Sequence, residues 1–158
     1  MNIQRSALSQ SKRLSLAAMF ATFTLLFLYI ASIIPAGKLA MYFLSSVFVA
    51  GLVVERETGL AFIMFAAVAL LSLLIVFPIT RAFYYIVFFG HYGIAKHYIE
   101  RMRDKVTAFI LKLLYFNAAA AILYFIATNV LLADVSLPLP VWALILIAQP
   151  VFIVYDYL

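Results

Sequence analysis

The sequence predicts an all-α fold, a polytopic membrane protein built as a bundle of about six transmembrane helices in one integral membrane domain, residues 1–158. Three observations predict this class. Hydrophobic residues make up 68% of the chain and charged residues only 11%, against about 45–50% and about 25% in soluble domains. The mean hydropathy is +1.17. The apolar residues also form long runs, and a run in lipid must satisfy its backbone hydrogen bonds within its own helix.

Breaks at proline, glycine and charge divide these runs into six spans. The first span stops at Pro35, the second at the charged residues 55–57, and the third at Pro78. The fourth leads into the charged residues 96–105, and the fifth into the polar, proline-containing segment 134–140. The second span is short, so a re-entrant segment is the main alternative there. The expected spans are 14–34, 39–54, 59–77, 82–98, 106–133 and 141–158.

Lys and Arg predict the orientation, because they accumulate on the cytoplasmic side of a membrane. With the N-terminus inside, the outer loops hold only Lys38 and Arg81. The cytoplasmic segments then hold Arg5, Lys12, Arg13, Arg56, Lys96, Arg101, Arg103 and Lys105. Both termini are therefore expected in the cytoplasm, with the protein in the plasma membrane. This topology explains the net charge of +5 without a nucleic-acid partner, and the long first span is expected to stay as an anchor.

Motifs for catalysis are missing from the sequence. It has no cysteine, no Gly-rich phosphate loop, no His-Glu-x-x-His and no Gly-x-Ser-x-Gly. The two histidines, His91 and His97, are six residues apart, which on a helix turns them by about 240° and separates them by about 9 Å. They are therefore not expected to share a metal ion. The sequence favours a protein that is not an enzyme and uses no cofactor.

Three polar side chains are expected at similar depths on successive helices. His91 lies near the middle of the fourth span, Asn117 about 16 Å along the fifth, and Gln149 about 12 Å along the sixth. Polar groups at this depth tend to face a bundle interior or a cavity. Two interpretations stay open: hydrogen bonds that hold the bundle together, and a binding or proton-relay site. Pro150 is expected to break the sixth helix beside Gln149.

A second polar group is expected near the outer face. Its members are Lys38, Arg81, Tyr84, Tyr85, Asn129, Asp134 and Trp142. Tyr and Trp are common at any membrane interface, so the two cations carry the signal. They could attract an anionic or polar ligand from outside, or contact lipid head groups.

Two further patterns concern contacts between helices and with partners. Ala17 and Ala21 share one face of the first span, where another helix backbone could approach closely. Residues 96–105 carry charges at i,i+4 spacing, which predicts a helical extension of the fourth span. This extension is expected to contact anionic membrane lipid, with docking of a soluble partner as the alternative.

The basic N-terminus leading into Arg13-LSLAAMFA-Thr22, together with six short apolar helices, resembles the substrate-binding S components of energy-coupling factor transporters. The resemblance covers essentially the whole chain. It implies that Ala17 and Ala21 contact a transmembrane coupling subunit, and that a small-molecule site opens outward while separate ATPase subunits hydrolyse ATP. The substrate-binding candidates are Lys38, Arg81, Tyr84, Tyr85, His91, Asn117, Asn129, Trp142 and Gln149. A structural membrane protein of the MreD type, without a ligand, has similar size and composition and is the alternative.

Overall fold

The computed structural model describes residues 10–130 and 141–157, with side chains described for 10–130 and 146–157. Within these ranges the chain is helical apart from short turns and contains no strand, which confirms the all-α prediction. The elements are α1 (Gln10–Ile33), α2 (Lys38–Val54), α3 (Thr58–Ile75), α4 (Thr80–Tyr84), η1 (Tyr85–Phe89), α5 (Gly90–Glu100), α6 (Lys105–Phe125), η2 (Ile126–Val130) and α7 (Val141–Tyr157). The η elements are π-helical. The segments α4–η1–α5 and α6–η2 each follow without a break.

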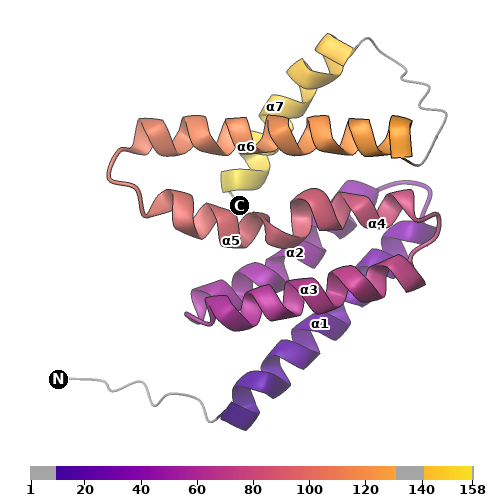
Figure 1. Ribbon diagram of the computed structural model, residues 1–158, viewed down its shortest axis with the longest axis vertical. Helices are drawn as coiled ribbons and strands as arrows, with labels where there is room; N and C mark the ends of the chain where they lie inside the picture. Colours follow the sequence, from indigo (N-terminus) through magenta and orange to yellow (C-terminus); the bar gives the residue numbers. More distant parts are fainter. Residues whose placement is uncertain (1–9, 131–140, 158) are drawn as a thin grey trace.

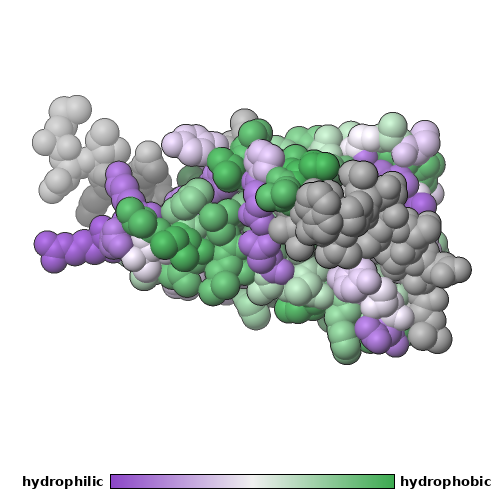
Figure 2. Space-filling model, turned by 90° about the horizontal axis from the view of Figure 1, so that it is seen from above, coloured by the Kyte–Doolittle hydropathy of each residue, from purple (hydrophilic) through white to green (hydrophobic). Residues whose placement is uncertain are grey.

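In the part of the chain that the structure describes, three helices are long and apolar enough to cross a membrane: Gln10–Ile33, Thr58–Ile75 and Lys105–Val130. Two shorter apolar helices are Lys38–Val54 and Leu146–Tyr157. The 17 residues of α2 extend about 26 Å, slightly less than the roughly 30 Å hydrocarbon core of a bilayer. Large apolar side chains such as Leu70 and Leu74 are about 70% exposed. Figure 2 shows extended apolar surface on one face, with strongly hydrophilic side chains gathered in patches. Such a surface suits lipid rather than water.

The α1, α2, α3 and α5 helices enclose the main core. In this core α2 packs between α1 and α5, and α3 contacts all three. The centre consists of fully buried side chains, among them Leu28, Val49, Leu52 and Val68. Gly93 of α5 permits close approach to α2, because an added Cβ there would lie 3.0 Å from the Ala50 Cβ and 3.2 Å from its Cα. In Figure 1, α6 runs alongside α5, and α7 crosses α6 at a steep angle.

The connections between helices alternate between two ends of the molecule. Figure 1 shows the α2–α3 and α5–α6 turns at one end, and the α1–α2 and α3–α4 connections at the other. We call the first the basic end, because Arg56, Lys96, Arg101, Arg103 and Lys105 lie in its turns or on the helix ends beside them. We call the second the Arg81 end. At the basic end Arg13 donates a hydrogen bond to Glu57 and ties the start of α1 to the α2–α3 turn.

The turn between α5 and α6 differs from the predicted helical extension over residues 96–105. The α5 helix ends at Glu100, although Lys96 and Glu100 do form the expected i,i+4 pair, at 4.0 Å. Asp104 is extended (φ −94°, ψ 113°) and caps α6, its carboxylate accepting from the Val106 and Thr107 amides at 3.1 and 3.2 Å. The prediction of a continuous helix over residues 96–105 was wrong. The Asp104 carboxylate accepts from the free amides at the start of α6, and a residue in this capping position adopts a non-helical conformation. The Thr107 hydroxyl and these amides hold the pKa of Asp104 below its usual value.

Candidate functional site

A cluster of charged side chains joins α5, α6 and α7 near the basic end. The Lys112 ammonium donates to Glu100 Oε1 at 2.7 Å and to Asp156 Oδ2 at 2.8 Å. Lys96 donates to the Asp156 backbone carbonyl and lies 3.4 Å from Asp156 Oδ1. The Tyr92 hydroxyl donates to Asp156 Oδ1 at 2.5 Å. The Lys112 and Asp156 side chains are only 10% and 12% exposed. Two cations thus balance two anions, and the charged cluster fastens the end of α7 to the rest of the bundle.

Sequence reasoning missed this cluster, although a signal was present. Lys112 lies within the fifth predicted span and Asp156 within the last turn of the sixth. Ionisable side chains in membrane spans are rare and usually pair with one another. The pairing could have been proposed on that rule alone. Within the described ranges, no group of three or more His, Asp or Glu side chains could hold a metal ion.

The three polar residues expected at mid-depth are only partly brought together. Gln149 Nε2 donates to Asn117 Oδ1 at 2.9 Å, and Asn117 Nδ2 donates to the Leu113 carbonyl at 2.7 Å. His91 does not join them: its ring packs 5.3 Å from Phe65 and 5.7 Å from Tyr115. The His91 Nδ1 atom is buried, and no side chain in the described part of the chain forms a hydrogen bond with it. The hydrogen-bonded pair therefore holds α7 against α6, and His91 lies in an aromatic environment.

Other predicted site residues lie apart from one another. Asn129 bonds within its own helix, to the Phe125 carbonyl at 3.2 Å. Tyr85 is fully buried against Phe65. Asp134 and the side chain of Trp142 lie outside the described residues. The predicted break at Pro150 was wrong, because α7 continues through Pro150 to Tyr157. Neighbouring helices allow proline within a membrane helix.

The small-residue face of α1 packs inside the molecule. Ala17 is 6% exposed and belongs to the core, and Ala21 packs against that core as a partly buried residue. The α1 helix contacts α2 and α3 most extensively. Of the two interpretations of this face, the structure favours packing within the bundle.

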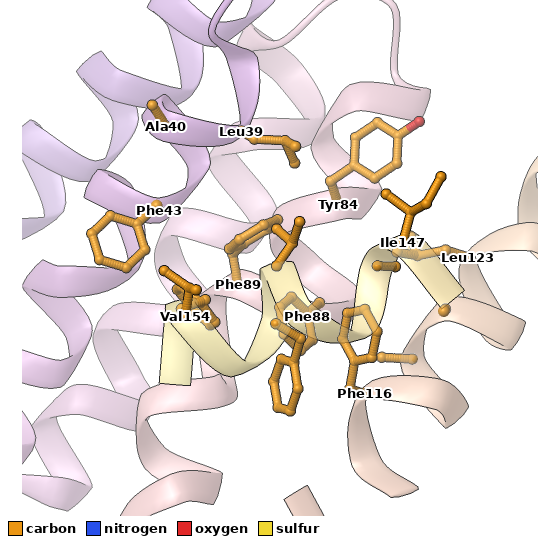
Figure 3. A pocket seen from close by; sticks show the side chains of 16 residues that line it. Leu39, Ala40, Phe43, Tyr84, Phe88, Phe89, Phe116, Leu123, Ile147 and Val154 are labelled. Carbon is orange, nitrogen blue, oxygen red and sulfur yellow. The ribbon is translucent and has the colours of Figure 1, made fainter. Parts of the chain in front are cut away.

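An apolar cavity of about 600 Å³ opens between α2, η1, α6 and α7 (Figure 3). Small side chains on α6 and α7 make room for it, among them Ala119, Ala120 and Ala148. Aromatic rings form part of its wall: Phe116 stacks on Phe152 with centroids 4.5 Å apart, and Phe88 meets Phe116 at 5.5 Å. The lining residues are Leu39, Ala40, Phe43, Tyr84, Phe88, Phe89, Phe116, Ala119, Ala120, Leu123, Ile147, Ala148, Val151, Phe152, Val154 and Tyr155.

A second hollow, which we call the cationic mouth, adjoins the apolar cavity at the Arg81 end. It has a volume of about 520 Å³ and is lined by Lys38, Leu39, Tyr42, Pro78, Thr80, Arg81, Tyr84 and Phe89. Leu39, Tyr84 and Phe89 line both hollows. Three of the residues that the sequence singled out, Lys38, Arg81 and Tyr84, therefore meet at one opening.

Backbone contacts hold the cationic mouth in shape. Arg81 Nη1 donates to the Ser32 carbonyl at the end of α1, and to the Phe77 carbonyl at 3.4 Å. The Tyr42 hydroxyl donates to the Arg81 carbonyl at 3.0 Å. No carboxylate of residues 10–130 or 146–157 lies within salt-bridge distance of Arg81 or Lys38. The charge of the mouth is thus not neutralised within the described chain, in contrast to the charged cluster.

A comparison with protein-family models, with curated proteins and with solved structures finds no significant match to this chain.

Proposed function

We propose that this protein is an integral membrane protein that captures a small solute in the apolar cavity, through the cationic mouth. One observation carries the proposal. Lys38, Arg81 and Tyr84, from two separate helices, line an opening that shares its walls with a cavity of about 600 Å³. Pockets for small molecules are typically about 300–1,000 Å³, apolar, and fitted with a few polar groups that fix orientation. The mouth and cavity together have these properties.

The proposal includes a topology of six membrane crossings. The crossings are α1, α2, α3, α4–η1–α5, α6–η2 and α7, each reversing the direction of the one before. The turns of the basic end and the helix ends beside them carry most of the described Lys and Arg residues: Lys12, Arg13, Arg56, Lys96, Arg101, Arg103 and Lys105. We therefore propose that this end faces the cytoplasm. The cationic mouth then opens on the outer face of the plasma membrane, and both termini are cytoplasmic.

A capture protein of this kind needs an energy source from elsewhere for uptake. The sequence has no phosphate-binding loop, so we propose that a transmembrane coupling subunit and ATPase subunits act with it. Because Ala17 is buried, a partner helix would have to contact the outward side of α1. Met19, Phe23 and Leu26 are exposed there, between 41% and 48%.

The test compares small molecules that co-purify with the wild type and with two alanine variants on α6. Ala120 lines the cavity and Ala121 does not, yet both are exposed. The Ala120→Phe change places a ring in the cavity, whereas Ala121→Phe is the matched control. Mass spectrometry of extracts should find a solute with the wild type and Ala121→Phe that is lost with Ala120→Phe. The same solutes in equal amounts from all three proteins would contradict capture in this cavity.

A structural protein of the MreD type is the second candidate, and one observation favours it. The charged cluster, in which two cations balance two anions, and the neutral Asn117–Gln149 hydrogen bond both fasten α7 to the bundle. Protein identification in the same affinity purification separates the two. ATPase subunits are expected for solute capture, and cell-wall or division proteins for a structural role.

A further inference from the structure

We propose that the captured solute is a long-chain carboxylate, with its hydrocarbon tail in the apolar cavity and its carboxylate at Lys38 and Arg81. This inference rests on the proposed function and names the chemical class of its solute. It follows from three features of the two hollows: the lining of the cavity, the charge of the mouth, and the wall that they share.

The lining of the cavity selects an apolar group. Among the described side chains, no charged one lines it, and Tyr84 and Tyr155 are the only polar ones. The Tyr155 hydroxyl already donates to Ser46 Oγ at 2.9 Å. A sugar, amino acid or nucleoside held here would lose its hydrogen bonds to water without gaining others, at a cost of roughly 1–3 kcal/mol for each buried polar group. A hydrocarbon chain loses nothing and removes apolar surface from water or lipid head groups.

The charge of the mouth selects an anion. Lys38 and Arg81 have no carboxylate within salt-bridge distance in the described ranges. The Ser32 and Phe77 carbonyls accept from one guanidinium nitrogen, Nη1, and so fix the side chain of Arg81. The remaining N–H groups of an arginine held in this way are suited to a carboxylate, which accepts hydrogen bonds from the guanidinium fork. Lys38 adds a second positive charge at the same opening.

The shared wall allows both parts to bind at once. Leu39, Tyr84 and Phe89 line both hollows, so the two lie side by side, and we place the bound chain across this shared wall. An anion without a tail would leave the cavity unfilled. A neutral lipid would leave the two cations without a carboxylate partner among the residues that the structure describes. The two hollows together therefore fit an amphiphile with one anionic end.

Binding of radiolabelled palmitate to purified protein in a neutral detergent tests the inference. Unlabelled palmitate should displace the label, whereas hexadecanol, which has the same chain without the charge, and acetate, which has the charge without the chain, should compete at least about tenfold less well. Lys38→Gln and Arg81→Gln should each weaken palmitate binding by about tenfold. Lys105→Gln, an exposed cation at the basic end, is the matched control and should bind as the wild type does.

Each result has one meaning. Equal competition by palmitate and hexadecanol, or unchanged binding in both mouth variants, would overturn the carboxylate assignment. Palmitate that fails to bind the wild type would also overturn it. The proposed function would survive that failure if Ala120→Phe still removed a co-purifying solute that Ala121→Phe retained. If Ala120→Phe removed no solute and did not affect palmitate binding, both proposals would fail. Melting temperatures of all variants check that each protein is folded.

Discussion

At the scale of single residues, Lys112 is the least exposed of the four charged side chains in the charged cluster. It bonds to Glu100 and Asp156 on two other helices while its own side chain is 10% exposed. A buried ion loses much of its hydration, and it is stabilised only when its partners remain in place. Lys112 therefore helps to hold α7 against the other helices, and we expect a substitution of Lys112 to change the stability of the protein.

We expect Lys112→Met to lower the free energy of unfolding by roughly 2 kcal/mol, because Asp156 then keeps only Lys96 and Tyr92 as partners. Asp156→Asn should have an effect of similar size. The double variant should lose less than the sum of the two, since neither group is left without its partner. Thermal unfolding in detergent measures all three, with the exposed Lys105→Met as control. Additive losses would contradict direct coupling of Lys112 and Asp156.

Asp104 has a different role, as the cap of α6. Its pKa is held below the ordinary carboxyl value because the Thr107 hydroxyl and two backbone amides donate to the carboxylate. A folded pKa below the unfolded one means that the cap stabilises the helix above the unfolded pKa, about 3.9. The stabilisation is lost as the pH falls through the lower, folded pKa.

Asp104→Ala should therefore speed hydrogen exchange at the Val106 and Thr107 amides several-fold at neutral pH. Asp104→Asn keeps an acceptor oxygen and should preserve much of the protection. The difference between wild type and Asp104→Ala should shrink in acid, as the wild-type carboxylate is protonated. A difference that did not shrink as acid protonated the wild-type carboxylate would exclude the carboxylate as its source.

At the scale of helices, the contact of α5 with α2 depends on Gly93. An added methyl group would lie 3.0 Å from the Ala50 Cβ and 3.2 Å from the Ala50 backbone, and backbone cannot move aside as a flexible side chain can. We expect Gly93→Ala to destabilise the protein by about 1–3 kcal/mol through overpacking. The control is Gly59→Ala on α3, where nothing lies within 4 Å of an added Cβ. Melting temperatures in detergent should fall for the first variant and stay nearly unchanged for the second.

The π-helical segment η1 affects both the core and the cavity. It places Tyr85 in the core while its consecutive residues Phe88 and Phe89 both line the apolar cavity. Short π-helical segments often occur at functional sites. The sequence predicted an uninterrupted α-helix over residues 82–98. The pattern of apolar residues does not show where one turn of the helix contains an additional residue, which is what makes η1 π-helical.

At the scale of the whole molecule, the alternation of the helix connections makes the proposed topology testable. The chain contains no cysteine, so single cysteines report their own position without background. Ala36 lies in the α1–α2 connection and Met102 in the α5–α6 turn, and both are exposed. In intact cells a membrane-impermeant maleimide should label Ala36→Cys at once and Met102→Cys only after permeabilisation. Labelling of both, or of Met102→Cys alone, would contradict the proposed orientation.

The sequence by itself determined the all-helical class and the approximate helix bounds, and it placed Lys38, Arg81 and Tyr84 within one group of seven residues expected near the outer face. These depend on composition, on breaks at proline and charge, and on the order of helices along the chain. In a bundle of alternating helices, the position of a residue along its helix places it at one end or the other. Residues in successive connections on the same side are therefore near one another before any packing is known.

Only the tertiary structure decided which residues at one depth meet. Asn117 bonds to Gln149 while His91 points among Phe65 and Tyr115, because the rotation of each helix depends on close packing with its neighbours. For the same reason Ala17 is buried in the core, and Lys112 pairs with Asp156, which lies 44 residues away in the sequence. The apolar cavity likewise forms where small residues of α6 and α7 face aromatic residues of η1. Helical spacing gives angles within one helix, but the angle between helices follows from the fit of their side chains.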